Sequence, residues 1–353
     1  MKVIMRNLLN NNIVFIGLIF FSGAGCRKDP HLIDEKPSSS GCVEAWCDEF
    51  PEPPEIGFAY TTEGYQYLAP CFNPNNSNEF VYIRWNGTNH AELFKYDLIT
   101  NTESVLLDPM SLGRPDWGRQ GWITFVYNYV NVWKIYDDGS QLTQLTSGED
   151  DKYPAFNYSG DEIYYLRKKW YSNAELDANP ELYKNSKMLI IDLNGNIVDS
   201  IIEPNIYNQY ETSFTYQTWS EAATDVNNYW CFAAGNDYRY GLYSLQNDTI
   251  LKLKEWFYPQ DFVDIEIYGT TLYYSKYQKG LFKLDANTGQ ETKLKWGCDT
   301  RHYKYLSVSS DGQKILVQKV ISKPYNDNKS IDEQNEIWLL DVNGCGEQKI
   351  LGD

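Results

Sequence analysis

Histidine is scarce in this chain of 353 residues, which has only His31, His90 and His302. A metal centre with three histidine ligands would need all of them, although they are spread along the whole sequence. No Gly-x-Ser-x-Gly sequence occurs, which argues against the nucleophile elbow of an attached α/β-hydrolase domain. These gaps favour a non-catalytic role.

Positive charge is also in short supply. There are 31 Lys and Arg residues against 48 Asp and Glu, and the net charge is −17 at pH 7. Nucleic acid is therefore not an expected partner, because its phosphates need Lys and Arg for affinity. The same deficit argues against a chain that lies flat on an anionic membrane surface.

The sequence contains no apolar run long enough to cross a bilayer, which needs about 20 residues. Its longest candidate, Ile13–Phe21, follows the basic residues Lys2 and Arg6 and precedes the small residues 22–25. A basic start, a short apolar core and small residues are typical of a secretory signal peptide. We therefore assign residues 1–25 to a signal peptide.

Cys26 follows the small residues directly, and this arrangement resembles the lipobox of bacterial lipoproteins. The resemblance implies lipid, palmitate included, on Cys26, membrane contact through that anchor, and an outer-membrane lipoprotein of the cell envelope. Ordinary cleavage, with Cys26 as an exported thiol, is the alternative. Lys28-Asp29 resembles the acidic surface-export signal of Bacteroidetes lipoproteins, so either side of the membrane stays open.

Residues 26–55 are expected to form a flexible tether, because Ser38–Gly41 and Pro51–Pro54 cannot build a packed core. Six further cysteines occur in this exported chain, where disulfides can form. Cys42 and Cys47 are close enough for a local loop, and Cys231 lies in an apolar strand typical of a buried thiol. The other pairings stay open.

Long helical periodicity is absent, whereas 29 Tyr, 11 Trp and 15 Phe favour β-structure. From about residue 66 the chain repeats a unit of four short strands every 40–60 residues or so, six times. The clearest copies are 154–165 and 306–317. This pattern predicts an all-β fold, a six-bladed β-propeller of four-stranded antiparallel blades, over residues 56–353.

The repeats also resemble those of TolB-type six-bladed propellers. The motif is Pro-x-aromatic-small-x-x-Gly-x-x-aliphatic, and it is carried best by 156–160 and 308–312. The third-strand residues Ile337, Trp338 and Asp341, with Gly344 after them, also fit. The resemblance implies the fold and says little about function, because propellers host many chemistries.

Strand periodicity assigns the faces of the innermost strands. One register is expected to pack between blades, and the register one residue earlier, small or polar, is expected to face the central channel. The first contains Phe72, Trp117, Phe156, Trp219, Ile265 and Val308, and the second contains Cys71, Asp116, Ala155, Thr218, Asp264 and Ser307.

A binding site is expected at one mouth of the channel, on the face with the links between blades. Two long loops, Lys168–Ser186 and Ser322–Asn335, are expected to flank it. Aromatic faces and one Arg there would suit a protein, peptide or glycan ligand. The candidate ligand-binding residues are Arg114, Asp116, Tyr153, Trp170, Tyr171, Tyr216, Asp264, His302 and Tyr305.

Two alternatives are kept open. Asp116 and Asp264 come from blades expected to face each other, so they could bind Ca²⁺, although no cofactor is the main expectation. The same acids could serve a carbohydrate-active enzyme, a glycoside hydrolase or lyase. Ring closure is open as well, because residues 56–60 could add a strand beside the last blade or the last blade could simply abut the first.

Overall fold

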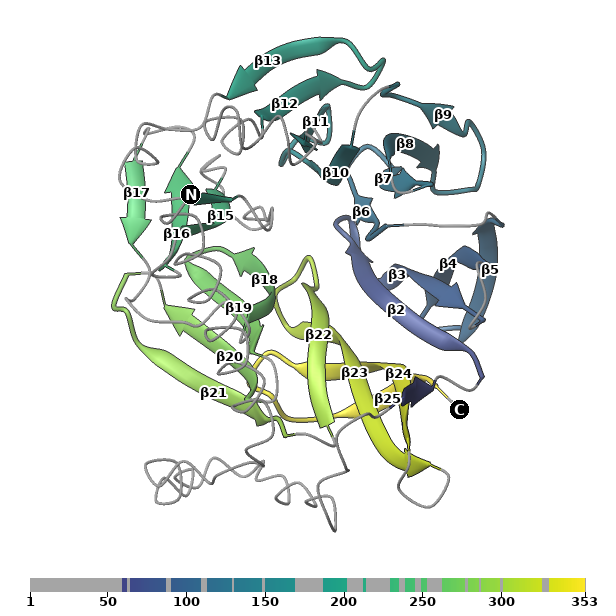
Figure 1. Ribbon diagram of the computed structural model, residues 1–353, viewed down its shortest axis with the longest axis vertical. Coiled ribbons are helices and arrows are strands. Elements are labelled where there is room, and N and C mark those ends of the chain that lie inside the picture. Colours follow the sequence, from purple (N-terminus) through teal and green to yellow (C-terminus); the bar gives the residue numbers. More distant parts are fainter. Residues whose placement is uncertain are drawn as a thin grey trace, which may run out of the picture.

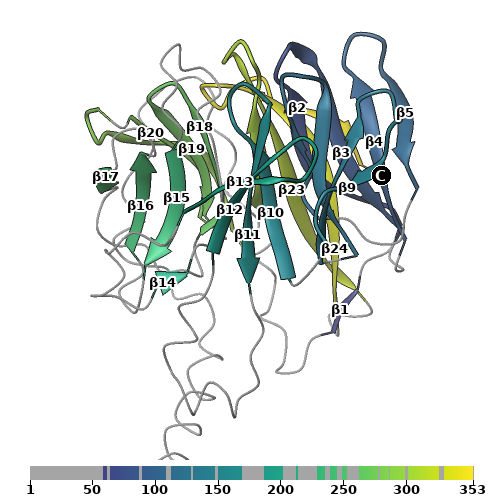
Figure 2. The ribbon, with the colours of Figure 1, turned by 90° about the horizontal axis from the view of Figure 1, so that it is seen from above.

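The computed structural model is an all-β ring with its innermost strands around a common centre (Figure 1). A view at right angles shows a disc with the strands running from one face to the other (Figure 2). The described residues are 59–61, 64–86, 90–108, 113–128, 130–147, 150–168, 187–201, 212–213, 229–234, 239–244, 249–252, 262–276, 279–285, 287–298, 301–325 and 330–352. The predicted signal peptide and tether lie outside them.

Five antiparallel sheets of four strands make the blades. Each blade runs from its innermost strand to its outermost strand in chain order. The first blade contains β2 (Gln66–Asn73), β3 (Asn76–Trp85), β4 (Ala91–Asp97) and β5 (Thr102–Leu107). The second contains β6 (Asp116–Trp117), β7 (Trp122–Tyr127), β8 (Asn131–Tyr136) and β9 (Thr143–Gln144). The third contains β10 (Asp150–Phe156), β11 (Glu162–Lys168), β12 (Lys187–Asp192) and β13 (Ile197–Ile201).

The remaining blades complete most of the ring. The fourth contains β14 (Thr212–Ser213), β15 (Tyr229–Ala234), β16 (Arg239–Ser244) and β17 (Thr249–Lys252). The fifth contains β18 (Phe262–Tyr268), β19 (Thr271–Lys276), β20 (Gly280–Asp285) and β21 (Glu291–Trp296).

A five-stranded closing sheet lies between the fifth blade and the first (Figure 1). The expectation of six four-stranded antiparallel blades is therefore corrected, since five blades have that form. The closing sheet contains β22 (Arg301–Val308), β23 (Lys314–Tyr325), β24 (Ser330–Asp341) and β25 (Gln348–Leu351), with β1 (Ala59–Thr61) added. β1 pairs with β24 in parallel, with Ala59 opposite Ser330 and Thr61 opposite Asp332.

The unusual length of β23 and β24 explains how a fifth strand fits. Twelve residues in each strand pair continuously, up to Tyr325 opposite Ser330. The expected long loop Ser322–Asn335 is therefore wrong, because most of it extends the hairpin. β25 pairs with the later half of β24, and the earlier half is left for β1. The added strand predicted near 56–60 is thus found, at Ala59–Thr61.

Polar contacts join the closing sheet to the first blade. The Ser307 Oγ accepts a hydrogen bond from the backbone N–H of Phe72 at 3.1 Å. A buried amide group of Gln66, Gln318 and Asn335 adds three bonds across this junction and one within the closing sheet. Gln318 Oε1 accepts from Ala69 N at 3.0 Å, and Gln318 Nε2 donates to Asn335 Oδ1 at 2.6 Å. Both the backbone and side-chain nitrogens of Asn335 donate to Gln66 Oε1 at 2.8 Å.

Apolar residues fill the spaces between neighbouring sheets, as the register predicted. Phe72 packs with Leu316 and Ile337 of the closing sheet, and Trp117 packs with Val81 of the first blade. Phe156 and Val308 occupy the corresponding positions further round, and all four members are buried. The side chains of Trp219 and Ile265, which complete this register, lie outside the described residues.

The cysteines divide into two kinds. Cys298 and Cys345 are disulfide-bonded, and Cys71 is a buried thiol. The predicted local loop of Cys42 and Cys47, and the side chain of Cys231, lie outside the described residues. Within the described ranges no helix is long and apolar enough to span a bilayer.

Candidate functional site at the channel mouth

Backbone irregularities gather on the innermost strands near the links between sheets. The pairing register shifts at the same place in β2, β10, β18 and β22. Ala69 and Tyr153 lie at two of these shifts with positive φ angles of 49° and 52°. Such bulges redirect side chains and are frequent beside functional sites. The face that carries these links is called the link face below.

Arg114 contacts two acids and a backbone carbonyl of other sheets. It belongs to the link before β6, yet its Nη1 lies 2.5 Å from Oδ1 of Asp264 in β18, on the opposite side of the ring (Figure 1). Its Nη2 donates to the Leu306 carbonyl at 3.2 Å and lies 3.4 Å from Glu266 Oε2. Burial lowers the pKa of Arg114, but the charges of Asp264 and Glu266 more than offset this and raise it. One guanidinium thus joins three sheets.

Two tyrosines accompany this ion pair. The Arg114 guanidinium lies 5.8 Å from the ring centre of Tyr305, and Tyr153 is 45% exposed. Burial raises the pKa of Tyr305, and the negative charge of Asp264 raises it further. The phenol of Tyr153 also acts on Tyr305 electrostatically. The structure therefore brings Arg114, Tyr153 and Tyr305 together, and we call these three residues the channel mouth.

The two predicted channel acids hold the ring together. Asp264 is fully buried, and its Oδ2 accepts the backbone N–H of Leu306 in the closing sheet at 2.7 Å. Asp116 Oδ2 accepts the backbone N–H of Phe156 in the next blade at 2.7 Å. Burial raises the pKa of Asp116, and the Phe156 N–H partly opposes this. A cation at Asp264 would have to displace Arg114.

His302 lies inside the fold instead of at the link-face surface. It belongs to β22, is 1% exposed and pairs with Val320 of β23. Burial lowers its pKa to about 3, and the charge of Lys304 adds to this. The imidazole is therefore neutral at physiological pH. Trp170, Tyr171, Tyr216 and Cys26 lie outside the described residues, as does most of the expected loop Lys168–Ser186.

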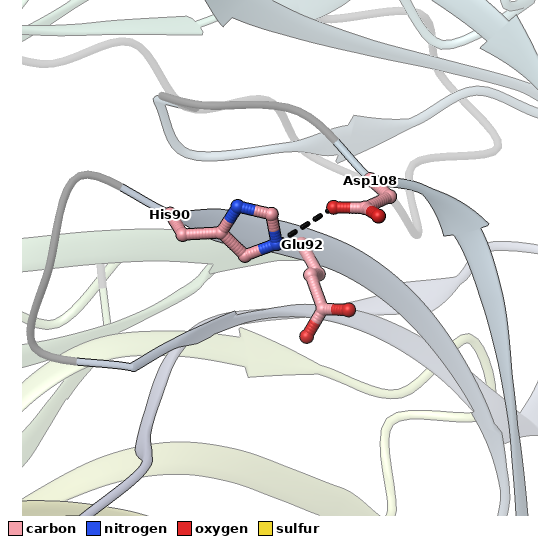
Figure 3. A group of neighbouring side chains, drawn as sticks. All are labelled: His90, Glu92 and Asp108. Carbon is pink, nitrogen blue, oxygen red and sulfur yellow. Dashed lines mark ion pairs between the residues drawn. The ribbon is translucent and has the colours of Figure 1, made fainter.

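Sequence reasoning missed a second group of polar side chains, on the first blade. His90, Glu92 and Asp108 offer ligand atoms that all lie within 4.8 Å of one another (Figure 3). The spacing His90-Ala91-Glu92 was a usable signal, because alternate residues of a strand share a face. Glu266 was missed too, although it lies two residues after Asp264 on the same strand.

Comparisons with known proteins establish the fold and go no further. No family model matches the chain, and no curated protein matches it. A TolB protein from Agrobacterium tumefaciens is similar with a TM-score of 0.52 and 10% identity, over 73% of this chain and 88% of that one.

Two proteins from Pyrococcus species are similar to the same extent. The propeller domain of the Trilobed protease from Pyrococcus furiosus has a TM-score of 0.50 at 10% identity, over 82% of this chain and 96% of that one. An acylaminoacyl peptidase from Pyrococcus horikoshii has a TM-score of 0.51 at 11% identity, over 81% of this chain. This chain spans 52% of that peptidase. The chain is a β-propeller with TolB-like neighbours.

Proposed function

We propose that the protein is a lipid-anchored, non-catalytic binding protein of the cell envelope that holds its ligand at the channel mouth. The observation that carries the proposal is the meeting of Arg114, Tyr305 and the exposed Tyr153 beside redirected strand backbone. In this reading the closing sheet serves as the sixth blade, so that one continuous ring supports the site. A rigid ring that holds binding residues in the loops at its rim is a common arrangement for ligand recognition.

The charge of the protein limits the class of ligand that the channel mouth can bind. Arg114 already faces the carboxylates of Asp264 and Glu266, at 2.5 Å and 3.4 Å, so its positive charge is offset within the protein. The whole chain also carries a net charge of −17. A polyanionic ligand would be repelled. An uncharged glycan or a peptide segment without net negative charge is favoured, because tyrosine rings supply flat contact area with a polar edge.

The test uses an array of neutral glycans, acidic glycans and peptides, probed with purified protein. Tyr153→Asn removes the exposed ring and suits the positive φ angle, because Asn tolerates the left-handed region. Ile99→Asn is the matched control, since Ile99 is 71% exposed on the β4–β5 turn, away from the link face. Binding should fall at least tenfold for Tyr153→Asn and stay unchanged for Ile99→Asn. Equal binding by both variants would show that the ligand does not bind at the channel mouth.

The same array distinguishes binding from catalysis. Asp116 and Asp264 each accept a backbone N–H group of a neighbouring sheet, and Asp264 is also paired with Arg114. Bound glycans should therefore be recovered intact after prolonged incubation. Shortened products that disappear in Asp116→Asn would instead support a carbohydrate-active enzyme.

The anchor is tested separately. Cys26→Ser should abolish palmitate labelling in a bacterial host and shift the protein from the membrane fraction to the soluble fraction. A soluble wild-type protein without label would favour ordinary cleavage before Cys26.

A further inference from the structure

A group of possible metal ligands lies where the first blade reaches the link face. His90 lies just before β4, Glu92 lies on β4, and Asp108 follows the end of β5. His90 and Glu92 are two residues apart, so the strand presents both on one side. Leu93 pairs with Leu107, which places Asp108 across from Glu92 on the neighbouring strand. One imidazole and two carboxylates therefore lie close together on two hydrogen-bonded strands, with His90 paired to Asp108 (Figure 3).

The atoms of the group are suitably disposed. His90 Nε2 lies 2.7 Å from Asp108 Oδ1, and all the candidate ligand atoms fall within 4.8 Å. The side chains of His90 and Asp108 are 43% and 60% exposed, so an ion can reach them from solvent. Both lie at strand ends, where a small outward movement is enough to admit an ion between them.

Arg84 fixes the third ligand without covering it. Its Nε and Nη2 donate to Glu92 Oε2 at 3.0 and 2.9 Å, and both bonds end on that one oxygen. One carboxylate oxygen of Glu92 lies within 4.8 Å of the ligand atoms of His90 and Asp108. Arg84 is itself held by Glu103 at 3.2 Å and by the Phe94 ring 4.0 Å below its guanidinium. Hydrogen bonds of this kind, made behind a metal ligand, orient the ligand and contribute to metal affinity.

We propose that His90, Glu92 and Asp108 form a divalent metal site, with Zn²⁺ as the ion of choice. Imidazole nitrogen and carboxylate oxygen are both ordinary zinc ligands, whereas Ca²⁺ and Mg²⁺ take oxygen. Three protein ligands leave at least one position of a tetrahedral ion for water or a ligand atom. The proposal is independent of the ligand proposed for the channel mouth. It also differs from the calcium alternative at Asp116 and Asp264.

The experiment is equilibrium dialysis of metal-stripped, full-length mature protein against ZnCl₂, with metal counted by mass spectrometry. Wild type should retain one Zn²⁺ per chain, and His90→Asn and Asp108→Asn should each lose at least tenfold in affinity. Arg84→Gln should lower the Zn²⁺ affinity roughly 10- to 100-fold, because Glu92 loses the hydrogen bonds that orient it. His31→Asn is the matched control, since it removes an imidazole from the tether, and it should bind like wild type.

Co²⁺ gives a second readout that separates this site from the thiols. Its visible absorption in wild type should be that of nitrogen and oxygen ligands, and it should vanish in His90→Asn. A thiolate charge-transfer band would place the ion on cysteine and overturn the proposal. If His90→Asn and Asp108→Asn bound Zn²⁺ with the affinity of wild type, the proposal would be overturned as well. Circular dichroism of each variant checks that the propeller is folded. If the channel mouth proves to bind no ligand, the outcomes of these metal experiments are unaffected.

Discussion

Arg114 and Asp264 are 150 residues apart in sequence, yet Nη1 of Arg114 lies 2.5 Å from Oδ1 of Asp264. The Asp264 carboxylate has no exposed surface, and it also receives the backbone N–H of Leu306. The pair therefore connects the second and fifth blades with the closing sheet. Its loss should be felt by the whole ring and not by one blade.

The first prediction concerns this pair. Asp264→Ala removes the nearest carboxylate from Arg114 and leaves the Leu306 N–H without its acceptor in a buried place, which should cost about 3–5 kcal/mol in the free energy of unfolding. Urea denaturation measures it. Arg114→Ala should cost a similar amount, and the double variant should cost less than the sum of the two. Additive losses would mean that the two side chains do not act as a pair.

The second prediction follows from the depressed pKa of His302, about 3 in the fold against about 6.5 in an unfolded chain. Because the unfolded state binds the proton more readily, the stability contributed by neutral His302 is fully present above pH 6.5. It is lost progressively as the pH falls toward 3. The full loss is of the order of 5 kcal/mol. His302→Gln should flatten the plot of unfolding free energy against pH in this window. An unchanged slope would contradict it.

The third prediction concerns the amide group that joins the first blade to the closing sheet. Gln318→Leu leaves the Ala69 N–H and the Asn335 Oδ1 without a partner in a buried place. Each orphaned group should cost roughly 1–3 kcal/mol. Gln348→Leu, on the exposed face of β25, is the control and should stay within about 0.5 kcal/mol of wild type. Equal stability of the two variants would show that the junction does not depend on these bonds.

The fourth prediction separates backbone strain from steric conflict at two glycines. Gly312 and Gly289 have similar positive φ angles, 67° and 68°. A Cβ at Gly312 would come 2.3 Å from the Tyr268 ring, whereas nothing lies within 4 Å at Gly289. Gly289→Ala should cost about 1 kcal/mol through strain alone. Gly312→Ala should cost clearly more in thermal unfolding, and Gly312→Ala with Tyr268→Ala should recover part of the difference.

Much of the fold was predictable because each blade repeats a local pattern. Period-two burial placed Phe72, Trp117, Phe156 and Val308 between sheets, and all four are buried there. The register one residue earlier contains Asp116 and Asp264, and both carboxylates bond to backbone N–H groups of neighbouring sheets. Strand periodicity could not predict the role of these two acids, because the N–H groups and the guanidinium that bond to them belong to other sheets. The prediction of a four-stranded blade was wrong at the closing sheet. There the sequence that extends β23 and β24 has the composition of an ordinary polar loop.

The candidate site shows the same division. Arg114, Tyr153 and Tyr305 share one register position, and the structure gathers them at the mouth. His302 was expected to bind a ligand at the mouth, and instead it is buried in β22. His90 seemed isolated, because its partner Asp108 comes from a strand end that only the pairing of β4 and β5 brings near.

The sequence by itself determined the strand repeat, the faces of each strand and the acidic character, since these depend on nearest neighbours and on composition. Only the tertiary structure decided that β1 pairs in parallel with β24, that Arg114 is offset by Asp264, and that His90 meets Asp108. Those contacts join residues whose separation along the chain carries no signal. The first two exist because closing the ring brings distant strands within hydrogen-bonding distance, and the third exists because β4 pairs with β5.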